Sequence, residues 1–332
     1  MSEHTRPVVA DVSVIVPAYR AADTIQRALR SVADQTLRPK EVVVVDDGSG
    51  DGTFEAAKAC RTFLAPTELK IFRQDNAGAG AARNRAVDNA SGEYLAFLDA
   101  DDDWLAEHLE ICLRHLLEDG STLIAHNEWL VEDGIERIND SARRICEWPD
   151  PVVSVYCKGC ISTSTIVTRR RAVIDAGGFD PALINGQDVD LWLAVLTRPG
   201  ASFAVLESPL SRYYLRAGSI NTHTARRFKF FIEIARRWSH EIARRPGGGL
   251  RALWFRMIAI HYEALRSFVR AGQWRQAFAV CLRAPLNILD VSVRQVTAAP
   301  YKRLNFLKHV QSENSAAATN STIDDKIAVL SS

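Results

Sequence analysis

Two hydrophobic patterns alternate along the first hundred residues of the chain. Short runs rich in β-branched residues are nearly continuously apolar, which is typical of strands buried on both faces. Between them, apolar residues recur every three or four positions, as on one face of a helix. Strands that alternate with helices indicate βαβ units. We therefore expect an α/β fold with a mostly parallel sheet, whose first strands are Val12–Tyr19, Glu41–Val45, Leu69–Phe72 and Tyr94–Leu98.

The rest of the chain follows other patterns. We expect a flexible loop around Glu132–Asp150 and a helix over Asp188–Thr197. From Thr224 onward the predicted helices are rich in Arg, Trp and Phe, and the final segment has the Ser, Asn, Ala and Thr excess of a disordered tail. These changes divide the chain into an α/β domain over 1–224, a basic amphipathic helical region over 225–310 and a disordered tail over 311–332.

The composition excludes several classes of protein. Of the 332 residues, 47% are apolar and 24% are charged, which rules out wholesale disorder, a collagen-like repeat and a polytopic membrane protein. The formal net charge of +1 hides an asymmetry, because 226–310 holds 17 Lys and Arg against four Asp and Glu. No nucleic-acid-binding module is recognisable, so we expect no nucleic-acid partner.

The chain also lacks the patterns of secreted and membrane-spanning proteins. No secretory signal is visible, and no stretch approaches about 18 uninterrupted apolar residues, so we expect a cytoplasmic protein without a transmembrane helix. The six cysteines show no disulfide framework. Cys157 and Cys160 form a CxxC pair that would need two more ligands for zinc, with Cys146 and His126 as candidates. A metal or redox role and a pair of buried thiols remain as alternatives.

Three polar clusters fall where predicted strands end: Pro17–Tyr19, Asp46–Ser49 and Asp99–Asp103. In a parallel sheet, ligands bind beyond these carboxyl ends. Asp99–Asp103 places four carboxylates within five residues, which repel one another unless they are solvated or bound to a cation. Carboxylate oxygens suit Mg²⁺ or Mn²⁺, which are usually shared with substrate phosphates. A metal is favoured over a solvated turn because a buried strand precedes the cluster.

A loop of small residues, Asn76–Asn84, enters a predicted helix. Its backbone N–H groups and Arg83 suit a phosphate or the edge of a base. The glycine spacing does not match the dinucleotide fingerprint GxGxxG, which argues against a dehydrogenase.

Five motifs occur in order along the chain and together resemble the family-2 glycosyltransferases. The motifs are Val-Ile-Val-Pro-Ala-Tyr, Val-Val-Val-Asp-Asp-Gly-Ser, Asn-Ala-Gly…Ala-Arg-Asn, Gly-Glu-Tyr…Phe-Leu-Asp-Ala-Asp-Asp and Gly-Gly-Phe-Asp…Gln-Asp-Val-Asp-Leu-Trp-Leu. The resemblance runs from about Val12 to Ser219. It implies an inverting enzyme that uses a nucleotide-sugar donor, with a Rossmann-like GT-A fold that carries helices on both faces of its sheet and is followed here by a helical segment.

The resemblance also implies roles on the donor side of the site. Pro17 and Tyr19 match the first strand end, which flanks the nucleotide. Asp47 matches the residue that forms a hydrogen bond with the base. Arg83 matches a basic residue near the base and diphosphate, and Asp99 matches the residue near the ribose.

The remaining implied roles concern the metal and the acceptor. Asp101 matches the ligand of Mn²⁺ or Mg²⁺, and Asp188 matches the general base, although a helix N-cap would also explain an Asp there. Asp190 is expected to assist acceptor binding. Arg216 replaces a His of the family's closing motif, so it is expected to contact the diphosphate. His223 is either a substitute metal ligand or a surface residue.

These roles predict transfer of a sugar, from a UDP-sugar in particular, to a hydroxyl of a glycan or lipid-linked acceptor in bacterial cell-surface polysaccharide or glycolipid synthesis. The alternative is a non-catalytic nucleotide-sugar-binding or scaffold protein with the same fold. The region 225–310 has its own alternatives. Aromatic residues and arginines on 226–245 describe either an interfacial helix at the inner face of the cell membrane or a helix packed on the α/β domain.

Overall fold

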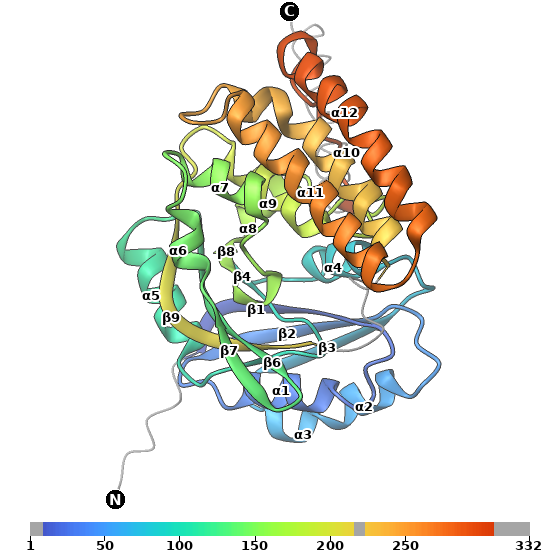
Figure 1. Ribbon diagram of the computed structural model, residues 1–332. Helices are drawn as coiled ribbons and strands as arrows, with labels where there is room; N and C mark the ends of the chain where they lie inside the picture. Colours follow the sequence, from blue (N-terminus) through green and yellow to red (C-terminus); the bar gives the residue numbers. More distant parts are fainter. Residues whose placement is uncertain (1–8, 216–222, 309–332) are drawn as a thin grey trace, which may run out of the picture.

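A nine-stranded sheet forms the centre of the computed structural model, which describes residues 9–215 and 223–308 (Figure 1). Its first four strands are parallel neighbours in the order β3-β2-β1-β4. All four coincide with strands predicted from the apolar runs, which confirms the parallel core. Their bounds are β1 (Val9–Ala18), β2 (Arg38–Asp46), β3 (Glu68–Arg73) and β4 (Tyr94–Phe97).

The other half of the sheet is mixed in direction. β8 (Val167–Arg169) is antiparallel to both β4 and β6 (Leu123–Glu132), and β6 pairs in parallel with β9 (Phe203–Tyr214). β6 and β9 therefore run in the direction of β4, and most strands of the sheet point one way, as predicted. The short strand β5 (Asp103–Trp104) lies beside β9 in antiparallel orientation.

The segment from 132 to 150 is not the flexible loop that we expected. It contains β7 (Ile135–Asn139), which forms an antiparallel hairpin with β6, and the helix α6 (Ser141–Ile145). Asp140 caps this helix by accepting a hydrogen bond from the Arg143 N–H at 3.0 Å. The side chains of β7 are exposed or half-exposed, so its sequence carries no alternation of buried and exposed positions.

Helices cover both faces of the sheet, as predicted. Val14 and Val16 of β1 belong to one hydrophobic core, whereas Ile15 belongs to the other. The first core is closed by α1, α2, α3 and α5, and the second by α4, α7, α8 and α9 (Figure 1). The bounds are α1 (Ile25–Ala33), α2 (Thr53–Ala59), α3 (Arg61–Leu64), α4 (Ala79–Asp88), α5 (His108–Glu118), α7 (Pro151–Lys158), α8 (Arg170–Asp175) and α9 (Gln187–Leu196), with a 3₁₀ turn at Thr163–Thr165.

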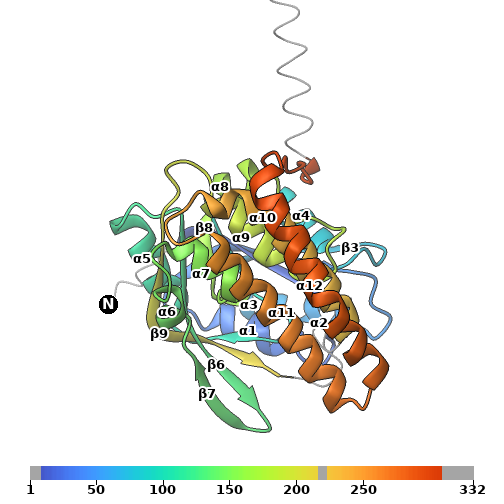
Figure 2. The ribbon, with the colours of Figure 1, turned by 45° about the horizontal axis from the view of Figure 1, so that its top comes forward.

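Three long helices, α10 (Thr224–Ala243), α11 (Leu250–Arg270) and α12 (Trp274–Thr297), lie over α7 and α9 (Figures 1 and 2). Ile232 and Trp238 of α10 belong to the same core as the sheet. The apolar face of α10 therefore packs on the α/β domain, which is one of the two arrangements that the sequence left open for this helix. The predicted tail, 311–332, lies outside the described residues.

The structure adds one observation that bears on the expectation of no membrane-spanning segment. Among the described residues, α12 is long and apolar enough to cross a membrane by length and composition alone, and only 17% of its apolar window is buried inside the protein. The charged residues Arg283 and Arg294 lie within this helix, so its sequence contains no long uninterrupted apolar run.

Candidate functional site

The ends of three adjacent parallel strands meet at one edge of the sheet. Because β2, β1 and β4 are neighbours and run the same way, Asp47, Tyr19 and Asp99 follow them at this edge. Pro17 is buried near the end of β1 and pairs with β2, whereas Tyr19 is 47% exposed. We call this region, marked by these four residues, the carboxyl edge. It is where ligands bind in open α/β sheets.

Asp47 holds the loop that leads into α4. It is almost fully buried, and its Oδ1 accepts hydrogen bonds from Gln74 Nε2 at 2.8 Å and from the Ala77 N–H at 2.9 Å. Its Oδ2 accepts one from the Gly78 N–H at 2.8 Å. Since a carboxylate accepts about four hydrogen bonds, one acceptor position of Oδ2 is left for an N–H of a ligand.

Arg83 reaches the carboxyl edge from α4. Its guanidinium is almost fully buried, lies 5.3 Å from the centre of the Phe179 ring and donates from Nη2 to Asp99 Oδ1 at 2.5 Å. The Asp99 side chain is 30% exposed and so is open to a ligand. The structure thus brings together a cation suited to a diphosphate and a carboxylate suited to a ribose hydroxyl.

Asp103 has protein partners on every side. Arg27 Nε lies 3.4 Å from its Oδ2, Arg212 Nη1 lies 3.3 Å from its Oδ1, and the Tyr214 hydroxyl donates to Oδ2 at 2.8 Å. These contacts join β5 to α1 and β9. Asp103 therefore stabilises the fold and is not a candidate ligand.

Asp102 is also buried, and its Oδ2 accepts a hydrogen bond from the Ser164 hydroxyl at 2.6 Å. Burial, and then the charges of Asp101 and Asp99, raise its pKa well above the usual value. Both neighbouring carboxylates thus act on Asp102, and a divalent cation at this position would offset the concentration of negative charge. Because their donor atoms are hard oxygens, Asp99 and Asp101 fit Mg²⁺ or Mn²⁺.

Asp188 lies in the first turn of α9 and is partly buried. Its Oδ1 accepts a hydrogen bond from the Val189 N–H at 2.8 Å, and its Oδ2 accepts one from the Thr163 hydroxyl at 3.3 Å. Burial raises the pKa of Asp188, the charge of Arg83 lowers it, and the charge of Asp99 raises it again. Asp188 therefore shares one cluster with Arg83 and Asp99, and its raised pKa suits a general base.

Asp190, two residues further along α9, points elsewhere. It is fully buried, its Oδ1 accepts from Trp238 Nε1 at 3.0 Å, and its Oδ2 accepts from Arg303 Nε at 3.1 Å. Arg237 Nη1 lies 3.7 Å from its Oδ1. The expectation that Asp190 assists acceptor binding is wrong, because residues two positions apart face different sides of a helix. Asp190 instead anchors the C-terminal region.

Comparison with known proteins shows to which family this chain belongs. The family profile described as "Glycosyl transferase family 2" matches residues 13–175. The glycosyltransferase TuaG of Bacillus subtilis is 30% identical over 64% of this chain and 82% of its own. The chain belongs to glycosyl transferase family 2.

Two further glycosyltransferases are similar to this chain over a comparable length. The amylovoran biosynthesis glycosyltransferase AmsB of Erwinia amylovora is 29% identical over 66% of this chain and 75% of its own. WfgD of Escherichia coli, a UDP-Glc:α-D-GlcNAc-diphosphoundecaprenol β-1,3-glucosyltransferase, is 29% identical over 68% of this chain and 83% of its own.

Solved structures confirm the GT-A fold of this family-2 chain. The crystal structure of S. aureus TarS 1–349 in complex with UDP-GlcNAc superposes with a TM-score of 0.64 at 20% identity, over 86% of this chain and 90% of TarS 1–349. The mannosyltransferase PcManGT from Pyrobaculum calidifontis, in complex with GDP-Man and Mn²⁺, gives 0.57 at 18% identity, over 89% and 90% of the two chains.

Two further residues, Asn84 and Glu128, have structural roles that the sequence did not assign. Asn84 clamps the segment before α9, because its side-chain amide accepts from the Phe179 N–H and donates to the Phe179 carbonyl, both at 2.7 Å. Glu128 of β6 is buried, and its pKa is raised by burial and further by the charge of Asp99. The available signal for Glu128 was a polar His-Asn-Glu run that directly follows the apolar residues of a strand.

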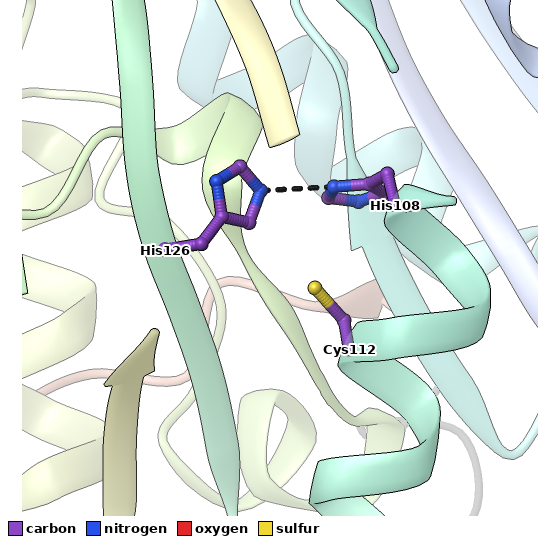
Figure 3. A group of neighbouring side chains, drawn as sticks. All are labelled: His108, Cys112 and His126. Atoms are coloured by element: carbon purple, nitrogen blue, oxygen red, sulfur yellow. Dashed lines mark hydrogen bonds between the residues drawn. The ribbon is translucent and has the colours of Figure 1, made fainter. Parts of the chain in front are cut away.

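The CxxC pair does not form a metal site with His126. Cys157 and Cys160 are buried, and burial raises their thiol pKa values to about 12 and about 11. His126 lies instead with His108 and Cys112 (Figure 3). The buried-thiol interpretation of the CxxC pair is therefore favoured by the structure.

The cluster of His108, Cys112 and His126 is a fully buried group between α5 and β6 (Figure 3). Nδ1 of His108 lies 2.9 Å from Nε2 of His126, and Nδ1 of His126 lies 2.6 Å from the Asn127 carbonyl oxygen. Burial lowers the pKa of His126 to about 4 and that of His108 well below its usual value, so both rings are neutral. A hydrogen bond between two neutral rings, one as donor and the other as acceptor, accounts for this geometry without an ion.

The closing motif contributes little to the described site. Arg216 lies outside the described residues. His223 is exposed and stands at the N-cap of α10.

Proposed function

We propose that this chain is an inverting glycosyltransferase that moves a sugar from a UDP-sugar to a hydroxyl of an acceptor. The observation that carries the proposal is the cluster of Asp188, Arg83 and Asp99 at the carboxyl edge. The TarS complex with UDP-GlcNAc and the donor in the name of WfgD, UDP-Glc, support UDP as the nucleotide.

The donor binds along the carboxyl edge. Pro17 and Tyr19 flank the base, and the free acceptor position of Asp47 Oδ2 receives an N–H of the base. Asp99 accepts a hydrogen bond from the ribose, and Arg83 places its buried charge beside the diphosphate. A fixed positive charge stabilises the negative charge that grows on the leaving group during transfer.

Asp101, together with Asp99, would hold Mn²⁺ or Mg²⁺. When bound, such an ion supplies further positive charge to the departing diphosphate. Mn²⁺ in the PcManGT complex supports this assignment.

Asp188 accepts the proton of the acceptor hydroxyl as its oxygen attacks the anomeric carbon. Attack comes from the face opposite the nucleoside diphosphate, so a single displacement inverts the anomeric configuration. The raised pKa of Asp188 makes its carboxylate a stronger base than an exposed aspartate. The Thr163 hydroxyl holds Oδ2, which fixes the direction of the carboxylate.

The acceptor binds in a cavity of about 320 Å³ between α7, α10 and α11. This cavity lies against the first turn of α9, since a Cβ at Gly159 in its wall would be 3.5 Å from the Val189 side chain. Phe228, Phe231 and Arg256 give it an aromatic and basic lining. Such a lining suits an acceptor that carries a phosphate or diphosphate on an apolar group, as the diphosphoundecaprenol acceptor of WfgD does.

The acceptor assignment has its own test. Arg256→Met is expected to raise the KM for the acceptor about tenfold and to leave the KM for the donor unchanged, because the two sites are separate. An unchanged acceptor KM would exclude Arg256 from acceptor binding. Synthesis of a cell-surface polysaccharide or glycolipid is the process that fits such an acceptor. The amylovoran biosynthesis enzyme AmsB and the lipid-linked acceptor of WfgD support it.

Transfer from a panel of radiolabelled nucleotide sugars in the presence of Mn²⁺, with diphosphate-linked lipid acceptors, tests the proposal. We expect one UDP-sugar to be used and Asp188→Asn to abolish transfer while donor binding, measured by thermal stabilisation, is kept. Asp34→Asn changes an exposed carboxylate at the end of α1 and is the matched control. Donor binding without transfer or donor hydrolysis across the panel would instead support a non-catalytic binding protein.

A further inference from the structure

The outer surface of the last two helices is apolar and exposed. On α12, large apolar side chains more than half exposed recur every three or four residues, which places them on one side of the helix. They include Trp274, Phe278, Leu282, Leu286, Leu289 and Val293. On α11, the corresponding side chains are Trp254, Ile258 and Tyr262, each at least 50% exposed. We call these nine residues the hairpin face.

The two stripes lie side by side. Trp254 Nε1 of α11 donates to the Ser292 hydroxyl of α12 at 3.2 Å, and His261 Nε2 lies 3.1 Å from Asn287 Nδ2. These pairs show that α11 and α12 are antiparallel neighbours, as Figure 2 also shows. The hairpin face is therefore one continuous surface and not a set of scattered apolar residues, which would need no explanation.

The same face is depleted of free negative charge. α11 and α12 contain only two acids, Glu263 and Asp290. Glu263 pairs with Arg227 at 2.9 Å, and Asp290 pairs with Arg236 at 2.7 Å and with Arg294 at 3.0 Å. The acids of the hairpin are thus already neutralised by arginines.

The free charges on this hairpin are positive. Arg266 and Arg270 near the end of α11, and Arg275 and Arg283 on α12, are exposed, and none of them forms an ion pair within the described parts of the chain. An apolar stripe flanked by unpaired arginines is the pattern of a helix that lies in a lipid interface. Trp254, Tyr262 and Trp274 add rings with one apolar and one polar end, which prefer that depth.

We propose that the hairpin face docks on an anionic lipid surface, with α11 and α12 lying in the plane of the interface. The cytoplasmic leaflet, whose surface potential is negative, is the surface that matches this charge. α12 does not need to span the bilayer, because Ala277, Val280 and Val291 on its opposite side are buried against the neighbouring helices. A spanning helix would have to give up that packing.

The position of the hairpin fits the proposed acceptor site but does not depend on it. Phe255 of α11 is 39% exposed and also lines the cavity against α9. A membrane at the hairpin face would thus lie next to the cavity in which we place a lipid-linked acceptor. Lipid binding is measured without any sugar substrate, so its failure and the failure of the proposed glycosyl transfer are separate results.

Flotation of the full chain with vesicles tests the proposal. We expect the protein to float with vesicles of phosphatidylcholine that contain phosphatidylglycerol, and to float less with phosphatidylcholine alone or at high salt. Replacing Phe278, Leu282, Leu286 and Leu289 together by Ser should lower the bound fraction at least about tenfold. Replacing Arg266, Arg270, Arg275 and Arg283 by Gln should remove the preference for the anionic vesicles and leave weak binding to both.

Matched control variants separate lipid docking from general changes in solubility and charge. Ile135→Ser/Ile138→Ser removes two exposed apolar side chains from β7, and Lys58→Gln/Arg114→Gln removes two exposed bases from α2 and α5. Both are expected to float like the unchanged protein. Because all substituted residues are exposed, circular dichroism and the melting temperature should be unchanged in every variant.

Two results would overturn the proposal. The first is a wild-type chain that stays out of the floating fraction at every content of phosphatidylglycerol. The second is a dimer that the Ser variant converts to a monomer in sedimentation while vesicle binding is unchanged, which would make the hairpin face a contact between two copies. Resistance of bound protein to extraction with alkaline carbonate would show that α12 spans the bilayer and would overturn the in-plane orientation.

Discussion

The two sides of the first turn of α9 carry carboxylates of the same type in opposite surroundings. Asp188 faces Arg83 and Asp99 at the carboxyl edge and carries a raised pKa. Asp190 faces the C-terminal region, is fully buried and is bound by Trp238 and Arg303. The difference teaches that one short motif supplies both a chemical group and the anchor of a neighbouring region.

The largest expected effect is a difference in the rate of glycosyl transfer between variants of the two acids. Asp188→Asn should lower the rate of glycosyl transfer about 10³-fold, the loss that follows removal of a general base, and should leave the melting temperature unchanged or higher. Asp190→Asn should retain transfer at temperatures where it is folded. The measurement is single-turnover transfer beside a thermal melt of the same samples. Equal losses of transfer in both variants would remove the distinction.

The next largest effect is on the free energy of unfolding, which should depend on Asp190. Asp190→Ala leaves the buried guanidinium of Arg303 without its carboxylate, so the free energy of unfolding should fall by about 3–5 kcal/mol. Urea unfolding monitored by tryptophan fluorescence measures this loss, with Asp34→Asn as the unaffected control. The double variant Asp190→Ala/Arg303→Met should recover part of the stability, because it removes the charge left alone. A double variant no more stable than the single one would argue against this pairing.

A smaller effect compares the apolar faces of α10 and α12. Trp238→Phe keeps the packing of α10 but removes the indole N–H that donates to Asp190 Oδ1, and should cost about 1–3 kcal/mol of unfolding free energy. Phe278→Ala on the exposed side of α12 should change it by less than about 0.5 kcal/mol. Both are read from urea midpoints at constant slope. A loss of similar size at Phe278 would mean that the hairpin face is covered in solution.

The sequence predicted the parallel core of the fold well because β1, β2 and β4 are buried on both faces and therefore appear as apolar runs. It placed Asp47 and Asp99 at the carboxyl edge for a related reason, since both lie just beyond the ends of such strands. It failed for β7, whose exposed side chains leave no alternation, and for Asp190, whose orientation depends on which side of α9 faces α10. It could not distinguish α10 from α12 either. Both are amphipathic, and only the tertiary contacts of Trp238 show that one of the two apolar faces is covered.

The last prediction concerns pH and applies to Asp188 but not to Asp190. Because burial raises the pKa of Asp188 above its ordinary value of 3.8, the carboxylate form needed for proton abstraction should be lost at a pH above 3.8 as the solution is acidified. The acidic limb of kcat/KM should therefore fall about tenfold per pH unit below that raised value.

The stability of the protein should depend on the ionisation of Asp188 in the opposite sense to its activity. A raised folded-state pKa means that the ionised form is the less stable one, so Asp188→Asn should be more stable than the wild type above the raised pKa, and the difference should shrink as the pH falls through it. Thermal melts of the two proteins over the same pH range measure this. A difference in stability that is independent of pH would mean that the environment of Asp188 does not disfavour its ionised form.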